Sequence, residues 1–269
     1  MIFGMPVLIE IKTLEACAAL CHELGFSFIE LNMNLPEYQT EKLDIAELAD
    51  ISAKYDIFYT IHLDENLSPC DFNVRVAEAW TKTVLQTIET AKQLAVPILN
   101  MHLNSGVWFT MPNKKVFLFD EYEEEYLQRL EVFRDNCTLA IGGADIKICV
   151  ENSGGYRPVL EKGLQLLLKS PVFALTFDIG HNAGIGGDDE PVIMRHSERL
   201  VHMHVHDADF KGKNHLALGT GELDLPRYFE LAQKLNCCCV LEVKTVAGLR
   251  QSAKWLKGLS DIAEAVLKD

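Results

Sequence analysis

The chain has 269 residues, a formal net charge of −14 at pH 7, and 48% hydrophobic against 24% charged residues. This composition is ordinary for a globular protein with a sizeable core; no apolar run reaches the roughly 18–20 residues that a membrane helix needs, and the acidic balance disfavours a nucleic-acid partner. The start of the chain lacks a basic segment and a cleavage-like site, and the eight cysteines form no paired C-x-x-C pattern, so we expect a reduced, cytoplasmic protein without a signal peptide.

Short apolar runs alternate with helical stretches along the whole chain. Strands are expected at residues 7–11, 28–32, 58–63, 97–103, 147–151, 173–179, 201–207 and 238–244. Helices are expected at residues 13–24, 43–55, 74–94, 121–139, 159–169, 192–199, 226–235 and 247–267. Eight strand–helix units in a chain of this length predict an α/β fold, a (β/α)8 TIM barrel formed as a single domain by residues 1–269.

Two features qualify this prediction. A doubly wound open sheet would also alternate in this way, but it favours a glycine-rich turn after the first strand, and residues 9–13 contain no glycine. An irregular insertion is expected at about residues 104–119, after the fourth strand. Its apolar part, residues 105–112, would suit either a lid over the substrate or a dimer contact, so a homo-oligomer stays open.

The seventh strand carries the strongest local signal. In Val201-His202-Met203-His204-Val205-His206-Asp207 the apolar residues share one face and the three histidines share the other. An edge strand with its histidines in water would give the same alternation. Three histidines opposite an apolar face also predict one wall of a polar cavity.

Polar side chains occupy the same face of the other strands. The set comprises Glu30, Asn32, Thr60, His62, Asn100, His102, Cys149, Glu151, Thr176, Asp178, His202, His204, His206, Glu242 and Lys244. A barrel interior is normally filled with bulky apolar layers, and isolated buried charges are very costly. We therefore expect a divalent cation to neutralise the acidic members near the C-terminal ends of the strands.

Four consecutive strands supply the ligands expected for that cation: Glu151, Asp178, His204 and Glu242. Three carboxylates and one imidazole suit Mn²⁺, Mg²⁺, Co²⁺ or Zn²⁺. Taken singly, each carboxylate also has a simpler explanation. Glu151 would pair with a lysine at the barrel bottom, Asp178 would cap the turn at Gly180, or Glu242 would pair with Lys244.

Motifs at the strand ends add a family resemblance. The residues are Phe28-Ile29-Glu30-Leu31, Ile61-His62-Leu63, Met101-His102-Leu103, Val150-Glu151-Asn152, Phe177-Asp178-Ile179-Gly180-His181, His204-Val205-His206-Asp207, 218–224 and Leu241-Glu242-Val243. In this order they resemble the xylose-isomerase-like TIM-barrel superfamily. That group contains sugar isomerases, epimerases, inosose dehydratases and endonuclease IV repair enzymes.

The resemblance implies roles for individual residues. In the epimerase and dehydratase branches one divalent metal ion is held by the matches to Glu151, Asp178, His204 and Glu242, and His181 matches a substrate-contacting histidine. A substrate-contacting glutamate of the epimerases is replaced by Arg157, which would hold a carboxylate or phosphate or would be a surface arginine at a helix start. The remaining histidines expected in the substrate pocket are His62, His102 and His215.

The expected activity is that of a metal-dependent isomerase or epimerase acting on a small sugar, keto-sugar or polyol derivative. Glu151 and Glu242 would exchange a proton with the substrate through a metal-stabilised enediolate. Loss of a β-hydroxyl would make the protein an inosose-dehydratase-like lyase. An endonuclease IV-like abasic-site phosphodiesterase would hold three zinc ions, but Lys213 stands where that branch has an aspartate. A non-catalytic sugar-binding barrel is the third class.

Overall fold

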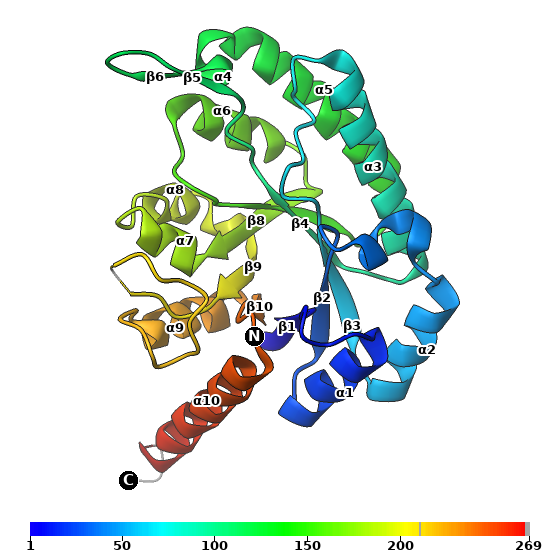
Figure 1. Ribbon diagram of the computed structural model, residues 1–269, viewed down its shortest axis with the longest axis vertical. Helices are drawn as coiled ribbons and strands as arrows, with labels where there is room; N and C mark the ends of the chain where they lie inside the picture. The colour runs from blue at the N-terminus through cyan, green and yellow to red at the C-terminus, as the bar shows by residue number, and fades with distance from the viewer. Residues whose placement is uncertain (210, 267–269) are drawn as a thin grey trace.

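Eight parallel strands close into a barrel in the computed structural model, which describes the backbone of residues 1–209 and 211–266 and side chains up to residue 259 (Figure 1). The strands follow the order β1-β10-β9-β8-β7-β4-β3-β2 around the barrel. Their bounds are β1 (Ile2–Pro6), β2 (Phe28–Asn32), β3 (Phe58–His62), β4 (Ile98–His102), β7 (Lys147–Glu151), β8 (Phe173–Asp178), β9 (Leu200–Val205) and β10 (Cys238–Leu241). The predicted TIM barrel is confirmed.

Helices cover the outside of the barrel (Figure 1). They are α1 (Leu14–Leu24), α2 (Ile45–Tyr55), α3 (Val74–Gln93), α4 (Leu118–Glu121), α5 (Glu123–Ile141), α6 (Pro158–Leu167), α7 (Ile179–Gly184), α8 (Glu190–Met194), α9 (Leu225–Leu235) and α10 (Val246–Val266). The helix expected at 247–267 ends within the described residues at Val266, and Leu267 lies outside them. None of the described helices is long and apolar enough to cross a membrane.

The helix expected at residues 192–199 is wrong in its bounds. The chain instead forms two short helices, α7 and α8, followed by a 3-10 turn at Ser197–Arg199. Gly186 and Gly187 adopt positive φ angles between the two helices, a conformation that other residues rarely take. Pro191 then opens α8, as proline does at the first turn of a helix.

The first strand is also misplaced by the sequence pattern: it is β1, Ile2–Pro6, and not residues 7–11. Gly4 and Pro6 weaken the strand signal of this segment. A Cβ at Gly4 would lie 2.5 Å from ring carbons of Phe28 in the neighbouring strand β2. Glycine is therefore needed where β1 passes this ring. Ile9 is 72% exposed, because residues after β1 leave the sheet in a turn.

The insertion after β4 is ordered, contrary to the expectation of irregular structure. β5 (Trp108–Thr110) and β6 (Lys115–Phe117) form an antiparallel hairpin with Trp108 opposite Phe117. Aromatic and β-branched residues favour such pairing, but strands of three residues are too short to give a periodic signal. The hairpin projects from the barrel at the top of the view (Figure 1).

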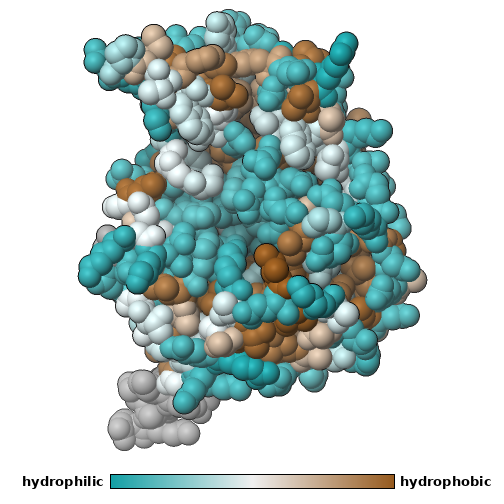
Figure 2. Space-filling view, viewed as in Figure 1, coloured by the Kyte–Doolittle hydropathy of each residue, from teal (hydrophilic) through white to brown (hydrophobic). Residues whose placement is uncertain are grey.

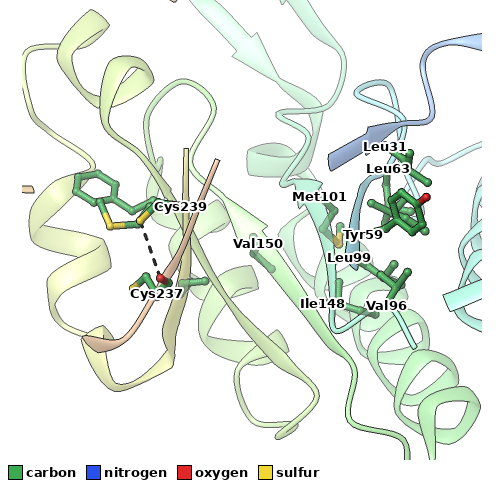
Figure 3. Packing of buried hydrophobic residues seen from close by; sticks show 14 of the residues in the cluster. Leu31, Tyr59, Leu63, Val96, Leu99, Met101, Ile148, Val150, Cys237 and Cys239 are labelled. Carbon is green, nitrogen blue, oxygen red and sulfur yellow. Dashed lines mark hydrogen bonds between the residues drawn. The ribbon is translucent and has the colours of Figure 1, made fainter. Parts of the chain in front are cut away.

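The apolar strand faces pack under the helices as predicted. Figure 3 shows part of this layer, with Leu31, Tyr59, Leu63, Leu99 and Met101 gathered together. All eight cysteines are free, and Cys237 and Cys239 are buried in the same core. Cysteine therefore acts here as a small hydrophobic residue.

Inside the barrel, apolar side chains fill only the end at which the strands begin. Phe28 is buried and stacks on Phe58, with ring centroids 5.0 Å apart. Ile98, Cys149 and Ala174 form a separate small cluster. Each of these positions lies on the strand face that carries polar residues two or four positions later, so the other end of the interior is polar. Figure 2 shows hydrophilic surface gathered around the middle of the viewed face.

Candidate metal centre

Three carboxylates and one imidazole converge at the C-terminal ends of four neighbouring strands. Glu151 ends β7, Asp178 ends β8, His204 lies in β9, and Glu242 follows β10. The His204 Nδ1 atom lies 3.4 Å from Glu151 Oε1, 3.9 Å from Asp178 Oδ2 and 3.6 Å from Glu242 Oε2. All four residues are buried. The structure thus brings the four metal ligands expected from the sequence to one point.

Each carboxylate uses one oxygen for a contact within the protein. Asp178 Oδ1 accepts the backbone N–H of His181 at 2.7 Å, and Glu242 Oε1 pairs with Lys244 Nζ at 2.6 Å. The helix cap and the lysine pair considered as simpler explanations therefore both exist. Glu151 Oε2 accepts a hydrogen bond from the amide of Asn100 instead of pairing with a lysine.

The second oxygen of each carboxylate has no donor with regular hydrogen-bond geometry, and imidazole nitrogens lie near it. Among the described residues, the buried atoms without a hydrogen-bond partner include Glu151 Oε1, Asp178 Oδ2, Glu242 Oε2 and His204 Nδ1. These are the atoms that face one another. Because buried polar atoms in folded proteins nearly always have partners, four such atoms around one point fit a bound cation with oxygen and nitrogen ligands.

His204 is oriented from behind by Glu30 of β2. Its Nε2 atom lies 2.9 Å from Glu30 Oε1, and Glu30 Oε2 accepts a hydrogen bond from the Thr60 hydroxyl at 3.0 Å. A carboxylate behind an imidazole directs the other ring nitrogen toward a metal. Sequence reasoning placed Glu30 and Thr60 on the polar face but gave them no role, since the alternation of a strand does not reveal which residue meets which across the barrel.

The charges of the cluster depend on one another. Burial would lower the pKa of His204, but the carboxylates of Glu151, Glu30 and Glu242 outweigh burial and raise it well above its ordinary value. Burial would likewise raise the pKa of Glu242, but the charges of His204 and Lys244 hold it far below its usual range. A proton on His204 therefore balances the acidic cluster, and a cation would compete with that proton for the same nitrogen.

Four further imidazoles expected in the substrate pocket surround this centre. The Nε2 atoms of His62 and His102 lie 3.5 Å and 3.3 Å from Glu151 Oε2. His181 Nδ1 lies 3.2 Å from Glu151 Oε1, and His215 Nδ1 lies 3.6 Å from Glu242 Oε2. His102, His181 and His215 are only partly buried, so they stand between the centre and the barrel mouth.

Two of these imidazoles have pKa values shifted in opposite directions. Burial would lower the pKa of His181, but its close contact with the Glu151 carboxylate and the charge of Asp178 raise it to about 9. Burial lowers the pKa of His215 to about 4, and the charge of Glu242 only partly offsets that effect. At neutral pH a charged donor and a neutral imidazole therefore face the same pocket.

Arg157, the fifth residue expected to contact substrate, is engaged with the insertion instead. Its Nε atom lies 2.8 Å from Asp120 Oδ2, and its Nη2 donates to the carbonyl of Ser105 at 3.0 Å. The guanidinium carbon stands 3.7 Å from the centroid of the Phe117 ring. These contacts hold the start of α6 against residues that precede, form and follow the hairpin.

Two residues to which the sequence assigned no individual role hold Asp178 in place. Asn152 accepts the backbone N–H of Asp178 at 2.8 Å and donates to its carbonyl at 2.9 Å. His206 Nε2 lies 3.3 Å from Asp178 Oδ1, and His206 Nδ1 accepts the backbone N–H of His215 at 2.8 Å. The alternation of the predicted strand pointed His206 inward. Nothing in the sequence indicated the two hydrogen bonds between the Asn152 side chain and the backbone of Asp178.

Comparisons with known proteins agree with this architecture. The family model described as "Xylose isomerase-like TIM barrel" matches residues 18–259. A D-tagatose 3-epimerase-like protein has a similar structure, with a TM-score of 0.80 and 23% identity over 99% of this chain and 100% of that chain.

Two further solved structures are similar. The 3-keto-D-glucoside 4-epimerase YcjR from E. coli has a TM-score of 0.75 and 14% identity, covering 96% of this chain and 99% of that one. The IOLI protein with a bound zinc atom has a TM-score of 0.71 and 15% identity, covering 94% and 96%. At these identities the likenesses show a common fold.

Proposed function

Because the chain belongs to the xylose isomerase-like TIM-barrel family, we propose that it is a divalent-metal-dependent isomerase or epimerase of a small sugar, keto-sugar or polyol derivative. The observation that carries the proposal is the convergence of four buried ligand atoms without a regular hydrogen bond, from Glu151, Asp178, His204 and Glu242, at the C-terminal ends of the strands. Barrel active sites form at this end of the strands. The names of the similar structures, two of which refer to sugar epimerases, support the same class of substrate.

One divalent cation, Mn²⁺, Mg²⁺, Co²⁺ or Zn²⁺, fits the donor set, and the zinc in the IOLI structure supports such an ion. When bound, it would polarise a substrate carbonyl and so acidify the neighbouring C–H bond. Glu30 would keep His204 oriented, and Lys244 would hold Glu242 in one position. The ring of partly buried imidazoles would hydrogen-bond substrate hydroxyls.

Glu151 and Glu242 are suited to exchange the proton. They come from β7 and the end of β10, on either side of β8 and β9 in the barrel, so they approach the centre from two sides. Burial would raise the pKa of each, but neighbouring positive groups, His204 first among them, keep both carboxyls ionised. One would accept the substrate proton and the other would return it, to the opposite face for epimerisation.

The test uses the variants Glu151→Gln and Glu242→Gln, with exposed Glu124→Gln as the control. Deuterium incorporation from D2O into a panel of ketohexoses reports proton exchange directly, and metal content is measured on each protein. We expect exchange to fall by roughly 10²–10⁴-fold, the usual contribution of a general base, in a variant that still binds metal. Near-normal exchange by either glutamine variant on a turned-over sugar would overturn the assignment.

An abasic-site phosphodiesterase is the second candidate. Its supporting observation is that His62 and His102 both point at Glu151 Oε2, which would suit a second metal ion. Asn100 already donates to that oxygen, and Lys213 occurs where a third ion would need a carboxylate. Cleavage of DNA with an abasic site would support this candidate, and its absence together with sugar turnover would remove it.

A further inference from the structure

Three hydrogen bonds connect four side chains inside the barrel and end at Glu151. They begin at His202 of β9, pass through Thr176 of β8 and Asn100 of β4, and reach Glu151 Oε2 in β7. We call this series the interior chain. Its members are at most 1% exposed, so solvent does not reach these bonds, and the proposed reaction does not use Thr176 or His202.

The interior chain lies one layer deeper in the barrel than the candidate metal centre. On a strand, residues two positions apart share a face, and three members precede residues of the centre by two positions. The register also brings Thr176 opposite both Glu151 and His202. The three pairs are Asn100 and His102, Thr176 and Asp178, and His202 and His204.

The direction of the hydrogen bonds follows from the number of donors. Asn100 turns its amide nitrogen to Glu151 Oε2, so its carbonyl oxygen is available to accept, and the Thr176 hydroxyl donates to it at 2.5 Å. A threonine hydroxyl has one hydrogen. Thr176 can therefore only accept at its 3.0 Å contact with His202 Nδ1, and His202 carries a hydrogen on that nitrogen.

This direction does not depend on the charge of His202, because Nδ1 donates in the neutral and in the protonated ring. Burial lowers the pKa of His202 to about 4, which favours the neutral ring. Its Nε2 then has a lone pair, in agreement with the lack of a hydrogen bond to Glu30 Oε2 at 3.5 Å. The Cys149 thiol beside Thr176 is only a weak donor.

The interior chain controls how Glu151 is presented. All three hydrogens point toward Glu151, so Oε2 is held as an acceptor, as an ionised carboxylate requires. With Oε2 held in this way, Oε1 faces His204 Nδ1 at 3.4 Å. If all three bonds were reversed, Asn100 would turn its carbonyl oxygen to Glu151, and that carboxyl would need a proton.

We propose that Thr176 and His202 are positioning residues for Glu151: acting through Asn100, they hold one carboxylate oxygen so that the other faces the cation and the substrate. What Glu151 then does rests on the proposed function. Without the Thr176 hydroxyl, Asn100 Oδ1 and His202 Nδ1 would both lose their partner in the barrel interior, which is costly for buried polar atoms. The Asn100 amide would then be free to turn, and Glu151 would lose its fixed orientation.

The first measurement is the position of the hydrogen on His202. Nitrogen-15 NMR of labelled protein distinguishes a ring with hydrogen on Nδ1 from one with hydrogen on Nε2, and the signal is assigned by its loss in His202→Asn. We expect the Nδ1–H form at neutral pH. A hydrogen on Nε2 alone would overturn the proposal. Because this experiment uses the unaltered protein, it decides the matter even if a variant fails to fold.

The second measurement compares Thr176→Val with Thr176→Ser. Valine has nearly the shape of threonine but lacks the hydroxyl, whereas serine keeps it. Zn²⁺ affinity is measured by competition with a chromophoric chelator. We expect it to fall by about tenfold in Thr176→Val, as for the loss of other groups that support a metal ligand, and to stay close to that of the unaltered protein in Thr176→Ser.

Thr87→Val is the matched control. Thr87 is also fully buried, but it lies in α3 outside the barrel, and its hydroxyl donates to the carbonyl of Thr83 at 2.9 Å. The variant loses the same group and should keep its Zn²⁺ affinity. Equal Zn²⁺ affinity in Thr176→Val and Thr87→Val, or equal losses in Thr176→Val and Thr176→Ser, would overturn the positioning role.

Failure of this inference and failure of the proposed function give different results. If a keto-sugar exchanges deuterium in a Glu151-dependent way but His202 carries its hydrogen on Nε2, the reaction stands and the interior chain is wrong. If His202 carries its hydrogen on Nδ1 and Thr176→Val weakens Zn²⁺ binding, but no sugar exchanges deuterium, the interior chain stands and the isomerase proposal is wrong.

Discussion

The Nε2 atom of His204 lies 2.9 Å from Oε1 of Glu30, although the two residues come from β9 and β2, which are not neighbours in the barrel. The contact spans the barrel interior and directs the Nδ1 atom of His204 at three carboxylates. Glu30 is buried, and Thr60 donates to its other oxygen. Glu30 is thus positioned to orient His204, a proposed metal ligand, without facing the three carboxylates itself.

We expect Glu30→Gln to weaken metal binding by roughly 10–100-fold, as the loss of such a supporting carboxylate does elsewhere. An amide carries no charge, so His204 would be less firmly oriented and less basic. Competition titration with a chromophoric chelator measures the affinity. Exposed Glu37→Gln, at the 3-10 turn after β2, is the control. Unchanged affinity in Glu30→Gln would show that Glu30 supports only the fold.

Metal-dependent stabilisation should grow with pH between about 6.5 and 9. The folded protein raises the pKa of His181 from 6.5 to about 9, so the stability contributed by the protonated ring is present below pH 6.5 and is lost as pH rises toward 9. His202 and His215, whose pKa values burial lowers to about 4, stay neutral across this window.

A bound cation would neutralise the carboxylates in place of the protonated His181 ring. Metal-loaded protein should therefore lose less stability over the same pH range. Thermal unfolding of chelator-treated and metal-loaded protein, followed from pH 6 to 9, measures the difference in Tm. We expect the two curves to diverge as pH rises. Parallel curves would contradict the idea that protons and metal balance the same charges.

Gly180→Ala should disturb the centre through steric contact. A Cβ at this position would lie 1.8 Å from Cε1 of His206, the ring that contacts Asp178. Overpacking of this kind costs about 1–3 kcal/mol of unfolding free energy, and metal affinity should fall with it. Gly184→Ala, in the same helix with no atom near its Cβ, should change neither quantity. Chemical denaturation of both variants decides the matter.

Arg157→Ala should loosen the hairpin without affecting the barrel. The change removes the ion pair to Asp120, the bond to the carbonyl of Ser105 and the stacking on Phe117. Hydrogen exchange at residues 108–117 should become faster, while exchange in the barrel strands stays the same.

Lysine cannot reproduce these three contacts, because it lacks the planar guanidinium that stacks and donates at once. Arg157→Lys should therefore resemble Arg157→Ala in hydrogen exchange. Lys162→Ala is the control, because Lys162 lies in the helix that Arg157 begins, α6, and forms an exposed ion pair with Glu123 of α5. Unchanged exchange at residues 108–117 in Arg157→Ala would show that the hairpin is ordered by its own strand pairing.

The sequence predicted the barrel and the convergence of the four proposed ligand residues because both depend on short-range periodicity. Alternation places Glu151, Asp178 and His204 on the inner face of their strands, and parallel strands end at the same edge. The first strand was misplaced because Gly4 is required by a ring on the neighbouring strand, and propensity does not record that contact.

Contacts between distant segments could not be predicted in the same way. Glu30 contacts His204 across the barrel, and the Asn152 side chain forms two hydrogen bonds with the backbone of Asp178. The sequence allowed Arg157 to be a substrate contact or a surface arginine at a helix start, and neither role predicts that its guanidinium pairs with Asp120 of the insertion. Each of these depends on three-dimensional distance that residue type and spacing do not encode.

Metal stoichiometry and position test the central claim most directly. Elemental analysis of purified protein, followed by anomalous scattering from crystals, gives both. We expect one divalent ion per chain, bound by Glu151, Asp178, His204 and Glu242. Three zinc ions involving His62, His102 and His215 would contradict the isomerase account and favour a phosphodiesterase, and an ion held elsewhere would refute the proposed centre.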